Sequence, residues 1–238
     1  MLQAFQSRQA TFISSDQWTH IPFSGHYPPT IQTLISRAIH LPSLLQQTDA
    51  LLASPYEDRF GQASALYNNF VGFFSVLNSW EQSLRNHHPG SIKDLLSNSN
   101  SKCPNPERSI WFSDITMANL YTHLWAFRII CATELSRLAA LFPLLNSHDS
   151  RTCDYFSPTK VQEHNKTLAT LICRSIGYLV QDGFEFYGPM SAMLPLQTAY
   201  KVFIADKQKN TLHVTHVKAL VECLVKKGIR SAPYIIYH

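Results

Sequence analysis

One long stretch of helical periodicity constrains this chain more than any other feature. Between Asp114 and Phe142 the sequence contains neither glycine nor proline. Apolar residues recur there at intervals of three and four, among them Leu124, Cys131 and Leu138. This spacing is that of one apolar face of an α-helix, so we expect a long helix over 114–142.

A second long helix is predicted upstream, between Pro55 and the pair Pro89-Gly90. Its apolar residues form three adjacent rows with a spacing of seven. The rows are Ala63, Phe70, Leu77 and Leu84; Leu66, Phe73 and Trp80; and Phe60, Tyr67 and Phe74. Three rows make a face that is wider than a coiled-coil seam, so we expect this helix to lie deep in a core.

Shorter periodic stretches predict the remaining helices. Residues 28–54 keep the helical spacing but contain Pro42, which predicts two helices instead of one. Further helices are expected over 159–182, 190–206 and 212–228, with Gly183 and Gly228 as C-terminal caps. No convincing run of alternating apolar residues predicts strands. The expected fold is therefore all-α, a multi-helix bundle of six or seven helices with two long core helices.

Composition indicates one large core. The chain has 238 residues, of which 45% are hydrophobic and 15% charged, against roughly 25% charged in an average soluble domain. We expect a single helical domain over 1–238, with an N-terminal segment at 1–27 and an exposed loop at 90–112 that is rich in serine and asparagine. The alternative is two lobes that share an interface. So few charges also suggest that another molecule covers part of the surface.

The cysteines and the apolar runs exclude two classes of protein. No Cys-x-x-Cys pair exists, which argues against a structural zinc site, and no run of 18 apolar residues predicts a membrane span. We therefore expect buried, reduced thiols in an intracellular protein without a membrane partner. The five cysteines are Cys103, Cys131, Cys153, Cys173 and Cys223.

A succession of short motifs resembles a known family. In chain order they are Trp18-Thr19-His20-Ile21-Pro22-Phe23, Leu41-Pro42-Ser43-Leu44-Leu45, Gln47-Thr48-Asp49-Ala50-Leu51, Leu77-Asn78-Ser79-Trp80-Glu81, Ala118-Asn119-Leu120-Tyr121-Thr122-His123-Leu124-Trp125, Ile172-Cys173-Arg174-Ser175-Ile176-Gly177-Tyr178, Gly188-Pro189 and Pro195-Leu196-Gln197-Thr198-Ala199-Tyr200. Over about 15–230 this order resembles the C-terminal regulatory region of the fungal binuclear zinc-cluster transcription factors. The resemblance implies a nuclear, all-helical domain that modulates the activity of a DNA-binding zinc cluster.

The chain departs from that family in lacking the zinc cluster itself. The family binds DNA through six closely spaced cysteines that hold two zinc ions, and no such group occurs here. The chain is then either the tail of a longer gene product or a stand-alone relative that acts through another protein. The net charge of +4 is small for a protein that binds nucleic acid. We interpret the densest group of basic residues as a solvent-exposed helix end. That group is Lys218, Lys226, Lys227 and Arg230. We expect no direct DNA binding.

Catalytic and metal-binding patterns are weak. Ser175 lies in a segment that superficially resembles a nucleophile elbow, but Cys173 stands where the first glycine is required and the segment is helical. His213 and His216 can share a helix face but have no third ligand, and His164 lacks the H-E-x-x-H arrangement. We expect no catalytic, cofactor-binding or metal-ligating residue.

The expected function is regulation without catalysis. The chain would modulate transcription in the nucleus through protein–protein contacts, either self-association or coactivator binding, with a small-molecule effector left open. The alternative is a helical small-molecule-binding protein or enzyme with an apolar pocket lined by aromatic residues. The residues considered for that pocket are Phe70, Phe73, Phe74, Trp80, Tyr121, Trp125 and Phe127.

Overall fold

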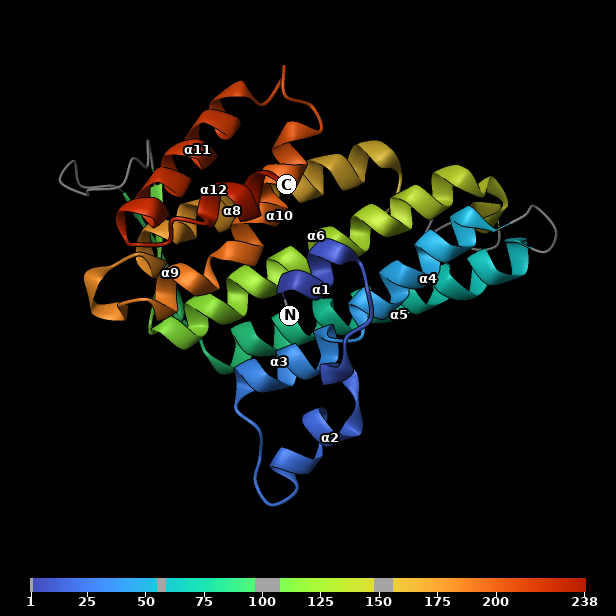
Figure 1. Ribbon diagram of the computed structural model, residues 1–238, viewed down its shortest axis with the longest axis horizontal. Coiled ribbons are helices and arrows are strands. Elements are labelled where there is room, and N and C mark those ends of the chain that lie inside the picture. The colour runs from blue at the N-terminus through green and yellow to red at the C-terminus, as the bar shows by residue number, and fades with distance from the viewer. Residues whose placement is uncertain (1, 55–58, 97–107, 148–155) are drawn as a thin grey trace. The chain divides into compact units, whose positions relative to one another are not determined.

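Helices account for most of the chain (Figure 1). The computed structural model describes residues 2–54, 59–96, 108–147 and 156–238, and 77% of it is helical. Within these ranges seven α-helices have seven or more residues, which confirms the predicted all-α fold. They are α3 (Thr30–Ala38), α4 (Leu41–Ala53), α5 (Arg59–His87), α6 (Ile115–Leu141), α8 (Pro158–Leu179), α10 (Met193–Ile204) and α11 (Thr211–Lys226).

Several shorter elements connect or flank these helices, and the sequence patterns did not predict them. The short α-helices are α1 (Leu2–Ser7), α2 (Asp16–Thr19), α9 (Tyr187–Ser191) and α12 (Ala232–Tyr237). The 3-10 turns are η1 (Phe12–Ser14), η2 (Ile21–Phe23), η3 (Pro143–Ser147) and η4 (Asp182–Phe184). Each is six residues or shorter, too short for helical periodicity to be recognised in the sequence.

The residues group into two compact units. The first unit comprises residues 1–78 and 131–161, and the second comprises 79–130 and 162–238. Three helices, α5, α6 and α8, contribute residues to each unit, because the divisions after residues 78, 130 and 161 fall within them. The single domain expected over 1–238 stays a prediction.

In the first unit, one of the three predicted apolar rows of α5 is buried as expected. Ala63, Phe70 and Leu77 are all but inaccessible to solvent, and Phe156 packs edge-on against Phe74 with 5.4 Å between ring centroids. The other two rows are buried only in part. Phe60 is exposed, and Phe73 is only half-buried. The outer rows therefore lie at the border of the core.

The break between the first two predicted helices occurs where proline requires it. α3 ends at Ala38, and α4 begins at Leu41 with Pro42 in its first turn. Proline is tolerated there because the first N–H groups of a helix have no partner within that helix. The break directs Leu34, Leu41 and Leu45 into the core, where all three are buried.

The second unit contains a β-hairpin, which corrects the expectation of an exposed loop at 90–112. Strand β1 (Ile92–Leu96) pairs antiparallel with β2 (Arg108–Phe112), so that Ile92 lies opposite Phe112. Ile110 and Phe112 are buried. Their β-branched and aromatic side chains favour a strand, but the run is too short to stand out against its serine-rich surroundings. Residues 97–107, including the Ser-Asn run, lie outside the described residues.

Glycine ends α11 as predicted but does not end α8. Gly228 has a φ of 95°, and its N–H donates to the carbonyl of Val225 while Ile229 N–H donates to that of Leu224. This is the double hydrogen bond of a Schellman cap. Gly183, by contrast, lies inside η4, four residues beyond the end of α8 at Leu179.

Candidate interaction surfaces

The predicted candidate nucleophile is a packed helix residue. Ser175 lies within α8 and is fully buried. Its hydroxyl donates a hydrogen bond of 2.8 Å to the carbonyl oxygen of Leu171, one turn earlier. This geometry fits the small helix-packing role that the sequence favours.

The candidate histidines are engaged in packing and in polar contacts. His213 stacks on Phe203 at 4.6 Å between ring centroids and with an interplanar angle of 8°. Burial and the positive charge of Lys166 lower the pKa of His213. Among the described residues, no three His, Cys, Asp or Glu side chains are close enough together to hold a metal ion.

The aromatic residues considered for a pocket are largely core residues. In the first unit Phe70 is buried, and in the second Tyr121, Trp125 and Phe127 are buried, with Tyr121 and Trp125 5.7 Å apart between ring centroids. These four rings therefore take part in the packing of the core, whereas Phe73 and Trp80 are only half-buried.

An open cavity of about 250 Å³ lies elsewhere in the second unit, lined by Asp182, Glu185, Phe186 and Lys227. Of these four residues, the sequence singled out only Lys227, and as part of a basic group. That lysine is not a free cation, because its ammonium group forms an ion pair with Asp182.

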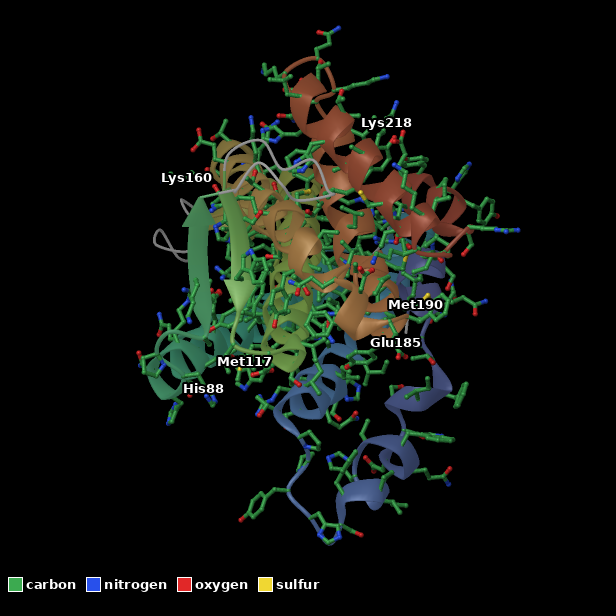
Figure 2. All side chains as sticks on the ribbon, turned by 90° about the vertical axis from the view of Figure 1, so that its left-hand side faces the viewer. His88, Met117, Lys160, Glu185, Met190 and Lys218 are labelled. Atoms are coloured by element: carbon green, nitrogen blue, oxygen red, sulfur yellow. The ribbon has the colours of Figure 1, made fainter. Side chains whose placement is uncertain are left out.

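The segment around this cavity, residues 182–190, exposes large apolar side chains, and we call it the Glu185 turn. Phe186, Tyr187 and Met190 are 63%, 60% and 53% exposed. Figure 2 shows Glu185 and Met190 on the same stretch of ribbon around α9. Neighbouring exposed apolar groups of this size are typical of a contact surface.

The backbone of the Glu185 turn is strained. Glu185 has φ 46° and ψ −126°, a conformation that favours glycine. The turn is held by the Glu185 N–H, which donates to the carbonyl of Asp182, and by the close approach of Gly188 to Leu179. A Cβ atom on Gly188 would lie 2.0 Å from the Leu179 carbonyl oxygen, so only glycine fits at that position.

The first unit has its own exposed apolar segment, residues 11–27, which we call the N-terminal arm. α2 packs on η1 and η2 within the arm, and Phe12 meets Trp18 edge-on at 5.9 Å. Both rings remain more than half exposed, as does Ile21, and Tyr27 is fully exposed. In Figures 1 and 2 the arm extends below α3.

Arg8 anchors the chain directly before the arm. Its guanidinium binds both oxygens of Asp49 on α4, at 2.7 and 3.0 Å, and Glu134 on α6 at 2.9 Å. Arg137 adds a second cation, 3.5 Å from Asp49 and 3.6 Å from Glu134. The hydrogen bond from Arg8 lowers the pKa of Asp49. Four charges therefore fix the base of the arm to two helices of the first unit.

A matching charged cluster joins three helices of the second unit. Glu81 on α5 accepts hydrogen bonds from Arg85, at 2.7 and 3.1 Å, and from Arg128 on α6. Arg128 also donates to Nε2 of His164 on α8 at 3.3 Å. Burial, with the positive charge of Arg128, lowers the pKa of His164. The imidazole is thus held neutral as an acceptor.

The sequence contained a partial signal for these surfaces. The arm holds Trp18-Thr19-His20-Ile21-Pro22-Phe23, a motif recognised for its resemblance and not for its exposure. The Glu185 turn is an apolar run between two predicted helices that has no helical spacing of its own. Such a run is consistent with burial as much as with exposure. The sequence pattern therefore does not predict that either segment is an exposed apolar surface.

Comparison with known proteins yields no relative: no protein family, no characterised protein and no solved structure matches this chain. The resemblance to the zinc-cluster factors therefore rests on the order of the sequence motifs. Among the helices in the described ranges, none has the length and apolar character needed to cross a membrane.

Proposed function

We propose that this chain is a non-catalytic helical regulatory domain that modulates transcription in the nucleus by contacting other proteins. The transcriptional part of the proposal rests on the motif order between residues 15 and 230, which resembles the regulatory region of fungal zinc-cluster factors. The protein-contact part rests on the surfaces described above. Self-association and coactivator binding are the two modes of contact that this proposal includes.

The strongest support for the proposal is the exposure of apolar side chains on the N-terminal arm. Phe12, Trp18, Ile21 and Tyr27 are all more than half exposed within 16 residues of chain. Burying apolar surface is worth roughly 25 cal/mol per Å², so a partner that covers these side chains gains free energy. Tryptophan and tyrosine are also the residue types that most often dominate the energy of protein interfaces.

Charge supports a protein partner over a nucleic acid. Lys227, which belongs to the densest basic group of the sequence, is neutralised by its ion pair with Asp182. The arm itself contains no lysine or arginine, and its one acid, Asp16, lies 3.1 Å from His20. Recognition of phosphates depends on clustered cations, which the arm does not supply.

The open cavity gives less support to a metabolite-binding function. Its volume of about 250 Å³ is below the roughly 300–1,000 Å³ of usual small-molecule pockets. The cavity has room for one side chain of a partner. Its size therefore favours protein–protein contact, as the exposed side chains of the N-terminal arm do.

A tethering experiment tests the proposal. The full chain is fused to an unrelated DNA-binding domain in fungal cells that carry a reporter gene with the matching operator. We expect the reporter to change by at least about threefold relative to the DNA-binding domain alone, since the partners that the chain recruits act at the promoter. If the fusion accumulates in the nucleus and the reporter does not change, the proposal is wrong.

A further inference from the structure

The cavity at the Glu185 turn has a net negative charge. Of its two carboxylates, Asp182 is bound by Lys227. Glu185 forms no ion pair with any described residue, and its side chain is exposed at the cavity. One uncompensated carboxylate therefore remains, and it favours a cation as the occupant.

The apolar side chains beside that carboxylate suit a long cationic side chain. Phe186 lines the cavity, and its ring is exposed. Aromatic faces attract guanidinium and ammonium groups, most strongly where water is excluded. Tyr187 and Met190 follow on α9 and offer apolar surface to the methylene stem of such a side chain.

The turn holds these groups in place before any partner arrives. The Phe186 ring packs against Gly228, where an added Cβ would lie 3.2 Å from the ring carbon Cε1. Gly188 fixes the other end of the turn against Leu179. A preorganised site spends less of its binding free energy on ordering its own side chains. The strained Glu185 backbone fits such a site, because strain of this kind is concentrated at functional positions.

We propose that the Glu185 turn binds an arginine or lysine side chain of a protein partner, with Glu185 pairing the cationic head and Phe186 packing against it. This inference rests on the proposed protein-contact function and names the chemistry of one partner. An anionic ligand is disfavoured because Lys227 is already paired with Asp182. A membrane surface is disfavoured as well, because anionic headgroups would be repelled by Glu185.

The test uses two small probes that differ only in charge. N-acetylarginine amide and N-acetylcitrulline amide are titrated into the ¹⁵N-labelled full chain, and backbone amide shifts are followed by NMR. We expect the amides of the Glu185 turn and of Gly228 to shift saturably with the arginine probe. The citrulline probe is expected to bind at least about fivefold more weakly, because it has the same shape but lacks the charge.

Three variants test the roles of the individual groups. Glu185→Gln is expected to weaken binding of the arginine probe at least about fivefold, because the carboxylate is lost. Lys227→Met is expected to strengthen it, because the variant removes a cation that lines the cavity. Glu163→Gln removes an exposed carboxylate from α8 that does not line the cavity, and it is expected to leave the affinity unchanged.

The proposal is overturned if citrulline binds as well as arginine, or if Glu185→Gln leaves the affinity of the arginine probe unchanged. Shifts spread over many exposed carboxylates and equal in all variants would show nonspecific attraction, which also overturns it. Probe binding is measured without a promoter. If the arginine probe does not bind and the tethered reporter does change, only the proposed partner chemistry is overturned. If the probe binds and the reporter does not change, only the transcriptional function is overturned.

Discussion

At the scale of single residues, two non-glycine positions with positive φ differ in what the side chain contributes to folding. Arg8 has φ 54°, and its guanidinium forms hydrogen bonds with Asp49 and Glu134. Glu185 has φ 46°, and its carboxylate forms no ion pair with any described residue. The strain at Arg8 is offset by its contacts, whereas the strain at Glu185 is not. This contrast predicts opposite effects of the same substitution.

Glu185→Gly is expected to stabilise the fold by about 1 kcal/mol. Relief of backbone strain is worth roughly 1–3 kcal/mol, which exceeds the extra entropy that glycine gives the unfolded chain. Urea unfolding measures the change. A variant less stable than the parent would show that the Glu185 conformation carries no strain.

Arg8→Gly is expected to destabilise the fold by about 2–3 kcal/mol, because the buried Glu134 carboxylate loses its closest cation. The same unfolding experiment measures this change. A neutral result would mean that Arg137, 3.6 Å from Glu134, is sufficient to compensate that carboxylate.

Gly188→Ala is expected to be among the most damaging single-methyl additions in the second unit. The new Cβ would lie 2.0 Å from the carbonyl oxygen of Leu179, so the backbone of α9 or of α8 would have to move. We expect a loss of about 2 kcal/mol or more in the free energy of unfolding. Gly183→Ala is the matched control, because no atom lies within 4 Å of its added Cβ. Equal effects of the two substitutions would contradict this packing account.

At the scale of elements, long apolar repeats were predictable and short irregular segments were not. The helix over 114–142 is observed at Ile115–Leu141, because its spacing of Leu124, Cys131 and Leu138 admits no other regular structure. By contrast α12 has only six residues, and Leu212, an apolar residue of α11, is 85% exposed. Helical periodicity predicts where a helix lies, but it does not determine which of the apolar side chains of that helix are buried.

The exposure of the two candidate surfaces could not be predicted from the sequence for a related reason. Trp18 and Phe186 belong to residue types that are usually buried, so the sequence alone favours a core position for both. Their exposure depends on which neighbours the fold brings near them. The charged clusters around Glu81 and Glu134 likewise depend on contacts between residues that are 36 to 126 positions apart.

His164 makes the contact among α5, α6 and α8 sensitive to pH. It accepts a hydrogen bond from Arg128, and Arg128 and Arg85 both bind Glu81. Burial lowers the pKa of His164 below its ordinary value of 6.5. As pH falls below about 6.5 the unfolded chain takes up a proton at this position that the folded chain does not. Stability is therefore lost as pH falls from 6.5 toward the folded pKa of His164.

Urea midpoints at pH 7.5 and pH 5.5 test this prediction in the parent chain and in His164→Gln. The glutamine oxygen can still accept from Arg128 but does not titrate. We expect the variant to lose less stability than the parent over this interval. An equal loss in the two chains would assign the pH dependence to other histidines, such as the half-buried His123, whose pKa is also lowered by desolvation.

At the scale of the whole molecule, each unit contains a buried cysteine that reports on its unfolding. Cys131 belongs to the first unit and Cys173 to the second, and both thiols are free. Burial raises the pKa of Cys131 and raises that of Cys173 to about 12, so neither forms the reactive thiolate in the folded chain. Both cysteines fulfil the expectation of buried thiols, while Cys103 and Cys153 lie outside the described residues.

We expect Cys131 and Cys173 to become reactive toward iodoacetamide at the same urea concentration. The helices α5, α6 and α8 each contribute residues to both units, so that unfolding either unit breaks three helices that the other unit uses. Mass spectrometry of peptides after labelling measures each thiol separately. Labelling of Cys173 at a lower urea concentration than Cys131 would show that the units unfold independently.

We propose above that the exposed N-terminal arm recruits other proteins to this chain and thereby alters transcription. The most direct measurement compares the tethered reporter for the parent with that for a triple variant, Phe12→Ser, Trp18→Ser and Ile21→Ser. Leu212→Ser, which removes an apolar side chain of α11 that is more exposed than any of these three, is the control. We predict that the triple variant loses most of the reporter change while the control keeps it. A triple variant that is folded, nuclear and as active as the parent would contradict the account.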